Sequence, residues 1–92
     1  MATGVTLPND RFEAPLVVGN HVHLVLRAFH TAVGATWSID DVKTGRSKEP
    51  AYAGDINEAK AVAEAVAKAH AHHVLRRADS NDQVPPIVWH SI

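Results

Sequence analysis

Alternating apolar and polar residues mark the clearest element of the chain, a predicted strand over residues 21–30 (HVHLVLRAFH). Successive side chains of a strand point to opposite faces. One face carries a nearly pure aliphatic set, Val22, Leu24, Leu26 and Ala28. The other face carries a mixed set, His21, His23, Val25, Arg27 and Phe29. We therefore expect the aliphatic face to pack into the core and the mixed face to be the wetter one.

Two shorter segments flank this strand. Residues 12–18 end in the apolar run LVV, and the Gly19-Asn20 pair that follows is typical of a two-residue hairpin turn. Because Pro15 has no backbone N–H, we expect residues 12–18 to form a short edge strand at most. Residues 31–35 contain Gly34 and are predicted as a loop.

After the loop, the pattern predicts a second hairpin. Residues 36–42 (TWSIDDV) alternate as a strand, and residues 43–46 (KTGR) are typical of a turn with Gly45 in the left-handed conformation. Residues 47–53 form the next predicted strand. Since Pro50 cannot donate a ladder hydrogen bond, this strand is expected at a sheet edge.

Helical periodicity replaces alternation over residues 54–77. Asp55 is a suitable N-cap, and Glu58 three residues later completes a pair that resembles a capping box. Spacings of three and four residues give one predicted stripe, Ala59, Val62, Ala63, Val66, His70 and His73. The fold class predicted is α+β, an antiparallel β-meander of three to four strands packed against one long C-terminal α-helix.

The 92 residues are enough for one domain. We predict a flexible tail over residues 1–11, a single α+β domain over residues 12–77 and a linker over residues 78–86. Residues 87–92 (IVWHSI) are β-prone, and we expect them to dock as a final strand on their own sheet or to swap onto a neighbour's.

Charge and composition narrow the classes of function. A net charge of −1 argues against a dedicated binder of the phosphate backbone. The absence of cysteine excludes disulfides, thiolate nucleophiles and cysteine-based metal sites. The start of the chain lacks the pattern of a signal peptide, and no run approaches the roughly 20 apolar residues of a membrane span. We expect a soluble, cytoplasmic protein without a membrane partner.

Seven histidines are the unusual feature of the composition. His21 and His23 alternate along a strand, and His70 and His73 have helical i, i+3 spacing, and both spacings occur in zinc, nickel and copper sites. The two pairs are expected at the same end of the fold but on opposite sides of the sheet. We therefore predict no cofactor and no closed metal site, with His70 and His73 as weak metal candidates.

No catalytic motif is present. Ser38 and Asp40 share a strand face and could lie near a histidine, but a catalytic triad requires all three groups in contact. The adjacent Asp40 and Asp41 project to opposite faces and are not a paired-carboxylate site. The sequence has neither a Gly-x-Ser-x-Gly nor a phosphate-loop pattern. We predict that the protein is not an enzyme.

Besides a histidine-based metal-binding protein, which is the last of the alternatives, two kinds of binding remain. A homodimer or a complex with another protein could form through the sheet edges or through the outer face that carries His21, His23, Val25, Arg27 and Phe29. The alternative is weak nucleic-acid binding by the same face and by a basic hairpin with Lys43, Arg46 and Lys48. Carboxylates nearby largely cancel these cations, namely Asp40, Asp41 and Glu49. Protein binding is therefore the favoured hypothesis.

Part of the chain, residues 16–74, resembles a class of small bacterial proteins of unknown function. The resemblance rests on a glycine before a strand, a tryptophan on the next strand, a Thr-Gly turn and a helix that begins with an x-x-Glu-Ala phrase. The residues that carry it are Gly19, Trp37, Ser38, Thr44, Gly45, Asp55, Glu58 and Ala59. The resemblance implies the meander-plus-helix fold and a bacterial source, and it implies no activity.

Overall fold

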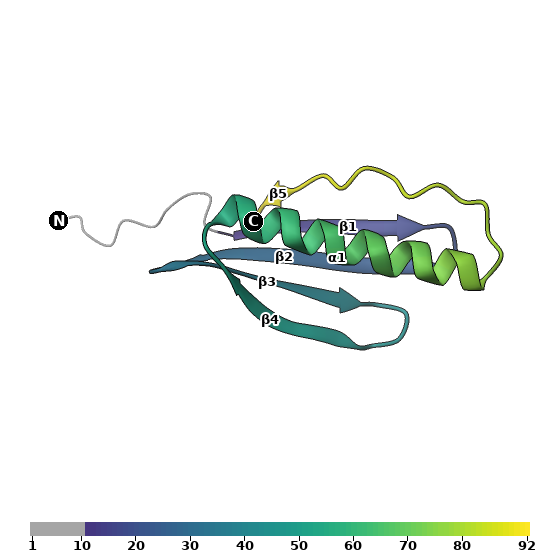
Figure 1. Ribbon diagram of the computed structural model, residues 1–92, viewed down its shortest axis with the longest axis horizontal. Coiled ribbons are helices and arrows are strands. Elements are labelled where there is room, and N and C mark those ends of the chain that lie inside the picture. Colours follow the sequence, from purple (N-terminus) through teal and green to yellow (C-terminus); the bar gives the residue numbers. More distant parts are fainter. Residues whose placement is uncertain (1–10) are drawn as a thin grey trace.

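The computed structural model describes residues 11–92, apart from the side chain of Glu49. Along this part of the chain the elements are β1 (Arg11–Val18), β2 (Val22–Thr31), β3 (Gly34–Asp41), β4 (Ser47–Ala53), α1 (Ile56–Arg77) and β5 (His90–Ser91). The strands form an antiparallel sheet in the order β4-β3-β2-β1-β5, and α1 lies along one face of it (Figure 1). The predicted α+β class is confirmed. Residues 1–10 of the predicted tail lie outside the described residues, and Arg11 belongs to β1.

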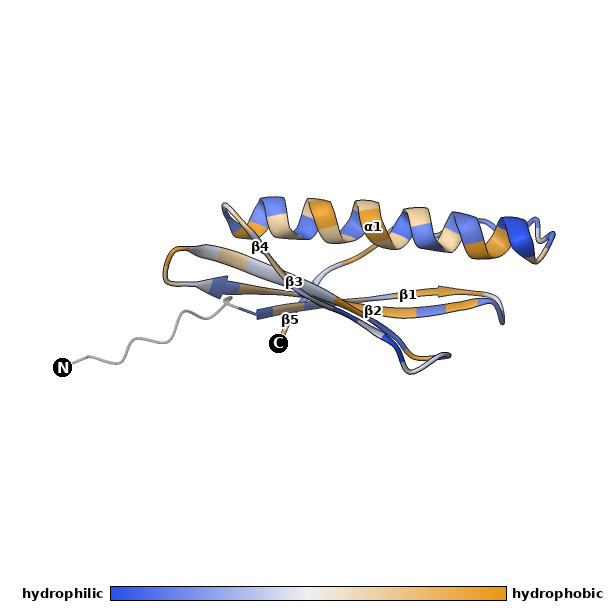
Figure 2. Cartoon of the chain, turned by 60° about the horizontal axis from the view of Figure 1, so that its bottom comes forward, coloured by the Kyte–Doolittle hydropathy of each residue, from blue (hydrophilic) through white to orange (hydrophobic). Residues whose placement is uncertain are grey.

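The alternation along β2 separates a core face from an open face, as the pattern predicts. Its aliphatic residues are buried under α1, namely Val22, Leu24, Leu26 and Ala28. Figure 2 shows α1 over this face and no helix over the other. On β3, Trp37 and Ile39 are buried on the same side, so the core is a single layer between sheet and helix.

The turn between β1 and β2 differs from the prediction by one residue. Val18 pairs with Val22, so three residues connect the strands and the third of them is His21. A two-residue turn would pair Leu16 with His23 and bring a core residue opposite an outer one. Since a one-residue slip moves every side chain of a strand to the wrong face, burial of Leu16 opposite Leu24 decides the register. His21 therefore lies in the turn and not on the face of β2.

Two other boundaries differ from the prediction. β1 has eight residues and lies between β2 and β5, so it is not a short edge strand, although β5 pairs only with Phe12 and Glu13. The predicted loop over residues 31–35 is a tight connection, because β3 already begins at Gly34. Gly34 has φ 155°, and a Cβ there would lie 2.6 Å from the carbonyl oxygen of Ala53. This close approach to β4 lets the strand start early.

The start of α1 is confirmed. The Asp55 side chain accepts a hydrogen bond from the Glu58 amide at 2.8 Å, and the Glu58 carboxylate accepts one from the Gly54 amide at 2.7 Å. These bonds satisfy amide groups that a helix cannot pair within itself. The predicted turn glycine, Gly45, has φ 73° and is likewise confirmed.

The predicted stripe on α1 is right in part: Ala59 and Ala63 are buried and Val66 packs against the core, but the stripe continues in another direction than predicted. The residues buried against the sheet follow steps of four, Ala59, Ala63, Ala67, Ala71 and Leu75. Val62 and His73 are exposed, and the His70 side chain is 45% exposed at the margin. The row of alanines, called here the alanine stripe, lets the helix backbone approach the sheet closely. Val62 and Val66 lie beside this line, and Leu75 continues it near the end of the helix.

The chain after α1 turns back along the helix and reaches the sheet again at β5 (Figure 1). Ile87 and Trp89 pack against the core on the way, and the Trp89 indole N–H donates to the Glu64 carboxylate at 2.9 Å. In the structure the C-terminal segment pairs with β1 of the same chain, through residues His90 and Ser91. The segment therefore covers the flank of α1 that lies on the β1 side.

Candidate functional site

The face of the sheet opposite α1 is the first candidate site. The strand registers place on it alternate residues of four strands. These are Arg11, Glu13, Pro15, Val17, His23, Val25, Arg27, Phe29, Thr36, Ser38, Asp40, Ser47 and Tyr52. Four of the five outer residues expected on the central strand are there and half-buried, namely His23, Val25, Arg27 and Phe29, whereas His21 is in the turn.

A network of ionic and hydrogen-bonding groups crosses the middle of this open face. The Arg27 Nε donates to the Glu13 carboxylate on β1 at 3.1 Å, and its guanidinium also contacts the Asp40 carboxylate on β3. The Ser47 hydroxyl of β4 donates to the other Asp40 oxygen at 2.6 Å. Side chains from four consecutive strands are thus joined in one row. Arg27 has two carboxylate partners inside the chain.

The network also determines the protonation state of Asp40. The hydrogen bond from Ser47 lowers the pKa of this carboxyl, and the hydrogen bond and charge of Arg27 lower it further. Asp40 is therefore ionised at neutral pH and acts as an acceptor. Within residues 11–92 no hydrogen bond joins Ser38, Asp40 and a histidine. Asp40 positions Arg27 in this arrangement.

Apolar side chains lie at both ends of the network. At one end Phe29 packs under the Arg11 guanidinium, 5.9 Å from the ring centre, and Tyr52 on β4 is 83% exposed. At the other end Val17 is 49% exposed beside Pro15 and Val25. The open face therefore combines a polar centre, whose charges are paired, with apolar ends whose side chains contact solvent.

The basic hairpin does not extend this face. Lys48 pairs with Ile39, whose side chain is buried toward α1, so Lys48 lies on the helix side of the sheet. Arg46 also lies on the helix side, and Lys43 is exposed in the turn. Because Arg27 is already bound by two carboxylates and faces the other way, these cations do not form one phosphate-binding surface.

The histidines considered as metal ligands are separated. The His70 Nε2 lies 3.5 Å from the Asp41 Oδ2, whereas His73 is exposed on another side of α1. His21 is in the turn and His23 is on the open face. Across residues 11–92 no three histidine, aspartate or glutamate side chains come together as a metal site would require.

The sequence analysis did not place several residues on the open face, among them Glu13, Ser47 and Tyr52. Glu13 was detectable in principle, because matching the buried faces of β1 and β2 pairs it directly with Arg27. The positions of Ser47 and Tyr52 on this face depend on an irregular register between β3 and β4, and no local sequence pattern predicts that register.

Within residues 11–92, no helix is long and apolar enough to cross a membrane. Comparison with protein-family models, curated proteins and solved structures finds no match to this chain.

Proposed function

We propose that this protein is a non-enzymatic binding module that docks another protein, in the first instance a second copy of itself, through the open face of its sheet. The observation that carries the proposal is the combination of exposed apolar side chains with an ionic network that is paired within the chain. Val17 and Tyr52 offer apolar area at opposite ends of the face. Between them, Arg27 already has both of its counter-charges.

Internal pairing matters because burying an unpaired charge in an interface is costly. A partner that covers Arg27 removes some water from it but does not have to supply a carboxylate. The side chains of Arg27, Glu13 and Asp40 are already only 33–39% exposed, so part of the desolvation has occurred in the single chain. Apolar contacts at the two ends can then favour association.

The open face is better suited to docking than the sheet edges. β4 carries Pro50, Lys48 and an irregular register opposite residues 37–39, and such features block pairing with another strand. On the other edge, the Arg11 carbonyl accepts from the Ile92 amide at 3.1 Å, so this side of β1 faces β5. Hydrogen-bonding direction alternates along a strand, and the missing N–H of Pro15 therefore falls on the same edge.

Sedimentation analysis over a range of concentrations tests the proposal. We expect a reversible dimer, and Val17→Lys should raise its dissociation constant about tenfold or more because a charge is buried among apolar groups. Val33→Lys is the matched control, since Val33 is 89% exposed in the β2–β3 turn and is outside the open face. Equal weakening by both variants would contradict the open face as the interface.

A chain that stays monomeric at millimolar concentration would refute self-association through this face. The cytoplasmic location and the bacterial source expected from the sequence remain predictions.

A further inference from the structure

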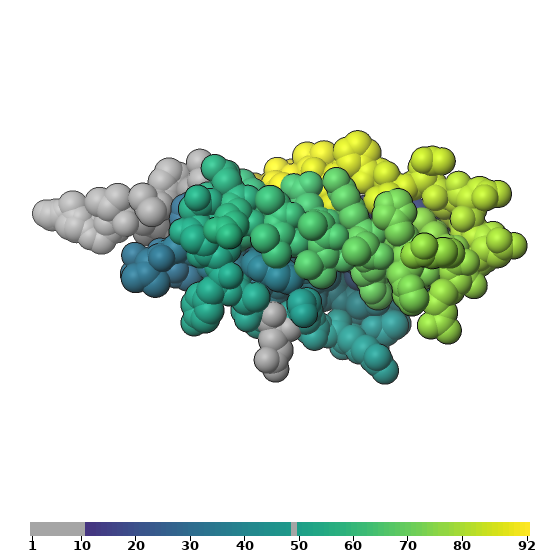
Figure 3. Space-filling view, in the orientation of Figure 1, coloured from purple at the N-terminus to yellow at the C-terminus, as the bar shows by residue number. Residues whose placement is uncertain are grey.

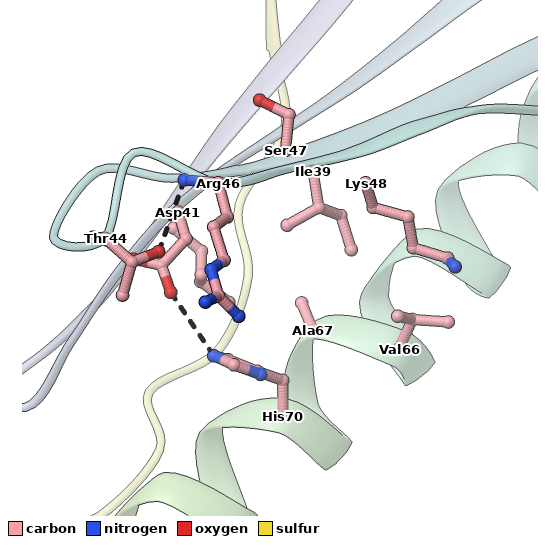
Figure 4. Close-up of a pocket in the computed structure, with 10 residues that line it drawn as sticks. Ile39, Asp41, Thr44, Arg46, Ser47, Lys48, Val66, Ala67 and His70 are labelled. Atoms are coloured by element: carbon pink, nitrogen blue, oxygen red, sulfur yellow. Dashed lines mark hydrogen bonds and ion pairs between the residues drawn. The ribbon is translucent and has the colours of Figure 1, made fainter.

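A groove lies on the other side of the sheet, between α1 and the β3–β4 hairpin (Figure 4). α1 packs chiefly on β2 and β3, and the alanine stripe fills only a narrow strip beneath the helix. A space of about 270 Å³ therefore remains on the β4 side. Its floor is apolar and consists of Leu24, Ile39, Val66 and Ala67.

Cations line the rim of this groove. Arg46 and Lys48 enter it from the hairpin, and in Figure 4 the Arg46 side chain points toward His70 on α1. In the described part of the chain, which excludes the Glu49 side chain, neither Arg46 nor Lys48 forms an ion pair. Among the described side chains, two charges of the same sign thus border an apolar floor without an ion pair of their own.

Asp41 is the carboxylate that lines the groove, and it has other partners. Its Oδ1 accepts from the amides of Lys43 at 3.0 Å and Thr44 at 3.2 Å, which closes the turn. Its Oδ2 lies 3.5 Å from the His70 ring. Asp41 therefore stabilises the hairpin and orients His70, and it leaves the charge of Arg46 and Lys48 available to a ligand.

We propose that this groove binds a small organic carboxylate with a compact apolar body. The carboxylate would contact Arg46, because a guanidinium group forms strong charge-assisted hydrogen bonds with it. Lys48, on the other side of Ile39 in Figure 4, would add to the positive potential of the rim. The apolar body would cover Ile39 and Val66. The volume exceeds the roughly 150 Å³ that holds a benzene ring and is below the roughly 300 Å³ of the smallest drug-sized pockets. One ring or a short alkyl chain therefore fits.

This site is independent of the proposed function, which uses the opposite face. The test is an NMR titration of the full chain with octanoate, followed at the methyl groups of Ile39 and Val66. We expect saturable shifts with octanoate, much weaker binding of 1-octanol, which lacks the charge, and much weaker binding of acetate, which lacks the apolar body. Binding of 1-octanol as tight as that of octanoate, or no saturable shift at millimolar octanoate, would overturn the proposal.

Charge reversal sharpens the test. Arg46→Glu should weaken octanoate binding about tenfold or more, the effect of losing one charge-assisted contact. Lys43→Glu makes a similar change of charge in the same hairpin but outside the groove, and it should leave binding nearly unchanged. Equal effects of the two variants would show that only the general field of the hairpin attracts the ligand and would contradict a bound position in the groove.

A filling variant gives a readout that does not depend on charge. Val66→Trp should occupy the groove and abolish the octanoate shifts at Ile39, whereas Val62→Trp, one turn earlier on α1 and not lining the groove, should preserve them. Thermal unfolding of each variant checks that it folds. Undiminished binding by a folded Val66→Trp protein would contradict the proposal.

Discussion

The helix-covered face and the open face of the sheet come from alternate residues of the same strands, yet different forces hold their side chains in place. The buried part of the covered face is apolar, since among the described residues no polar or charged side chain is buried. The open face carries Arg27 with Glu13 and Asp40, held by directional contacts between strands. Burial alone specifies the first face, whereas the second also requires a particular strand register.

The two flanks of α1 show a similar contrast. In the space-filling view the C-terminal segment lies along one flank of the helix, and the β3–β4 side has no such cover (Figure 3). On the covered flank Trp89 packs against the core and hydrogen-bonds to Glu64. On the other flank the groove keeps an apolar floor in contact with solvent. Unfilled apolar surface therefore remains where no further segment of residues 11–92 covers it.

The contrast between the two faces can be tested with one substitution made twice on β2. Val22 is 3% exposed on the covered face, and Val22→Ala should lower the free energy of unfolding by about 2 kcal/mol through lost burial and a residual cavity. Val25→Ala on the open face should cost less than about 1 kcal/mol. Urea denaturation measures both, and equal losses would mean that the open face is as tightly packed as the core.

Substitution in the alanine stripe should cause the next largest change in the free energy of unfolding. Ala63→Leu inserts a large side chain where α1 is closest to the sheet and should destabilise the fold by about 1–3 kcal/mol. Ala65→Leu, two residues later on the exposed side, should change stability by less than about 0.5 kcal/mol. Thermal unfolding compares them. If Ala63→Leu were as stable as Ala65→Leu, the helix would not be fixed by small side chains.

Substitutions in the ionic network should change the free energy of unfolding least, and this change should depend on pH. Because the folded state lowers the pKa of Asp40, the ionised carboxylate stabilises the fold above the unfolded pKa of about 3.9, and this contribution is lost as the pH falls through the lower folded value. Asp40→Asn should therefore cost less than about 1 kcal/mol at pH 7, since the side chain is partly exposed. The difference from the native chain should vanish in acid.

Ser47→Ala provides the control for this prediction. It removes the hydrogen bond that contributes most to the lowered pKa of Asp40, so it should reduce the acid dependence and keep the charge pair with Arg27. Melting temperatures measured from pH 7 to pH 2 test both variants. A gap between Asp40→Asn and the native chain that persists undiminished at pH 2 would contradict the role assigned to the carboxylate.

The open face was predictable in part from local pattern. Alternation placed Val25, Arg27 and Phe29 together because side-chain direction in a strand depends only on position along the strand. The charge of Arg27 suggested a binding surface, but its neutralisation by Glu13 and Asp40 depends on residues 14 and 13 positions away, so it requires the register. The sequence alone could not tell a free cation from a paired one.

Local chemistry by itself determined the strand faces, the Asp55 cap and the left-handed turn at Gly45, because each depends on a few adjacent residues. Tertiary structure decided the three-residue turn that contains His21, since core pairing across two strands outweighs the preference of the Gly-Asn pair. It also decided which helix face is buried, because the closeness of the sheet selects alanine over valine and histidine. Long-range packing alone placed Arg46 and Lys48 beside α1.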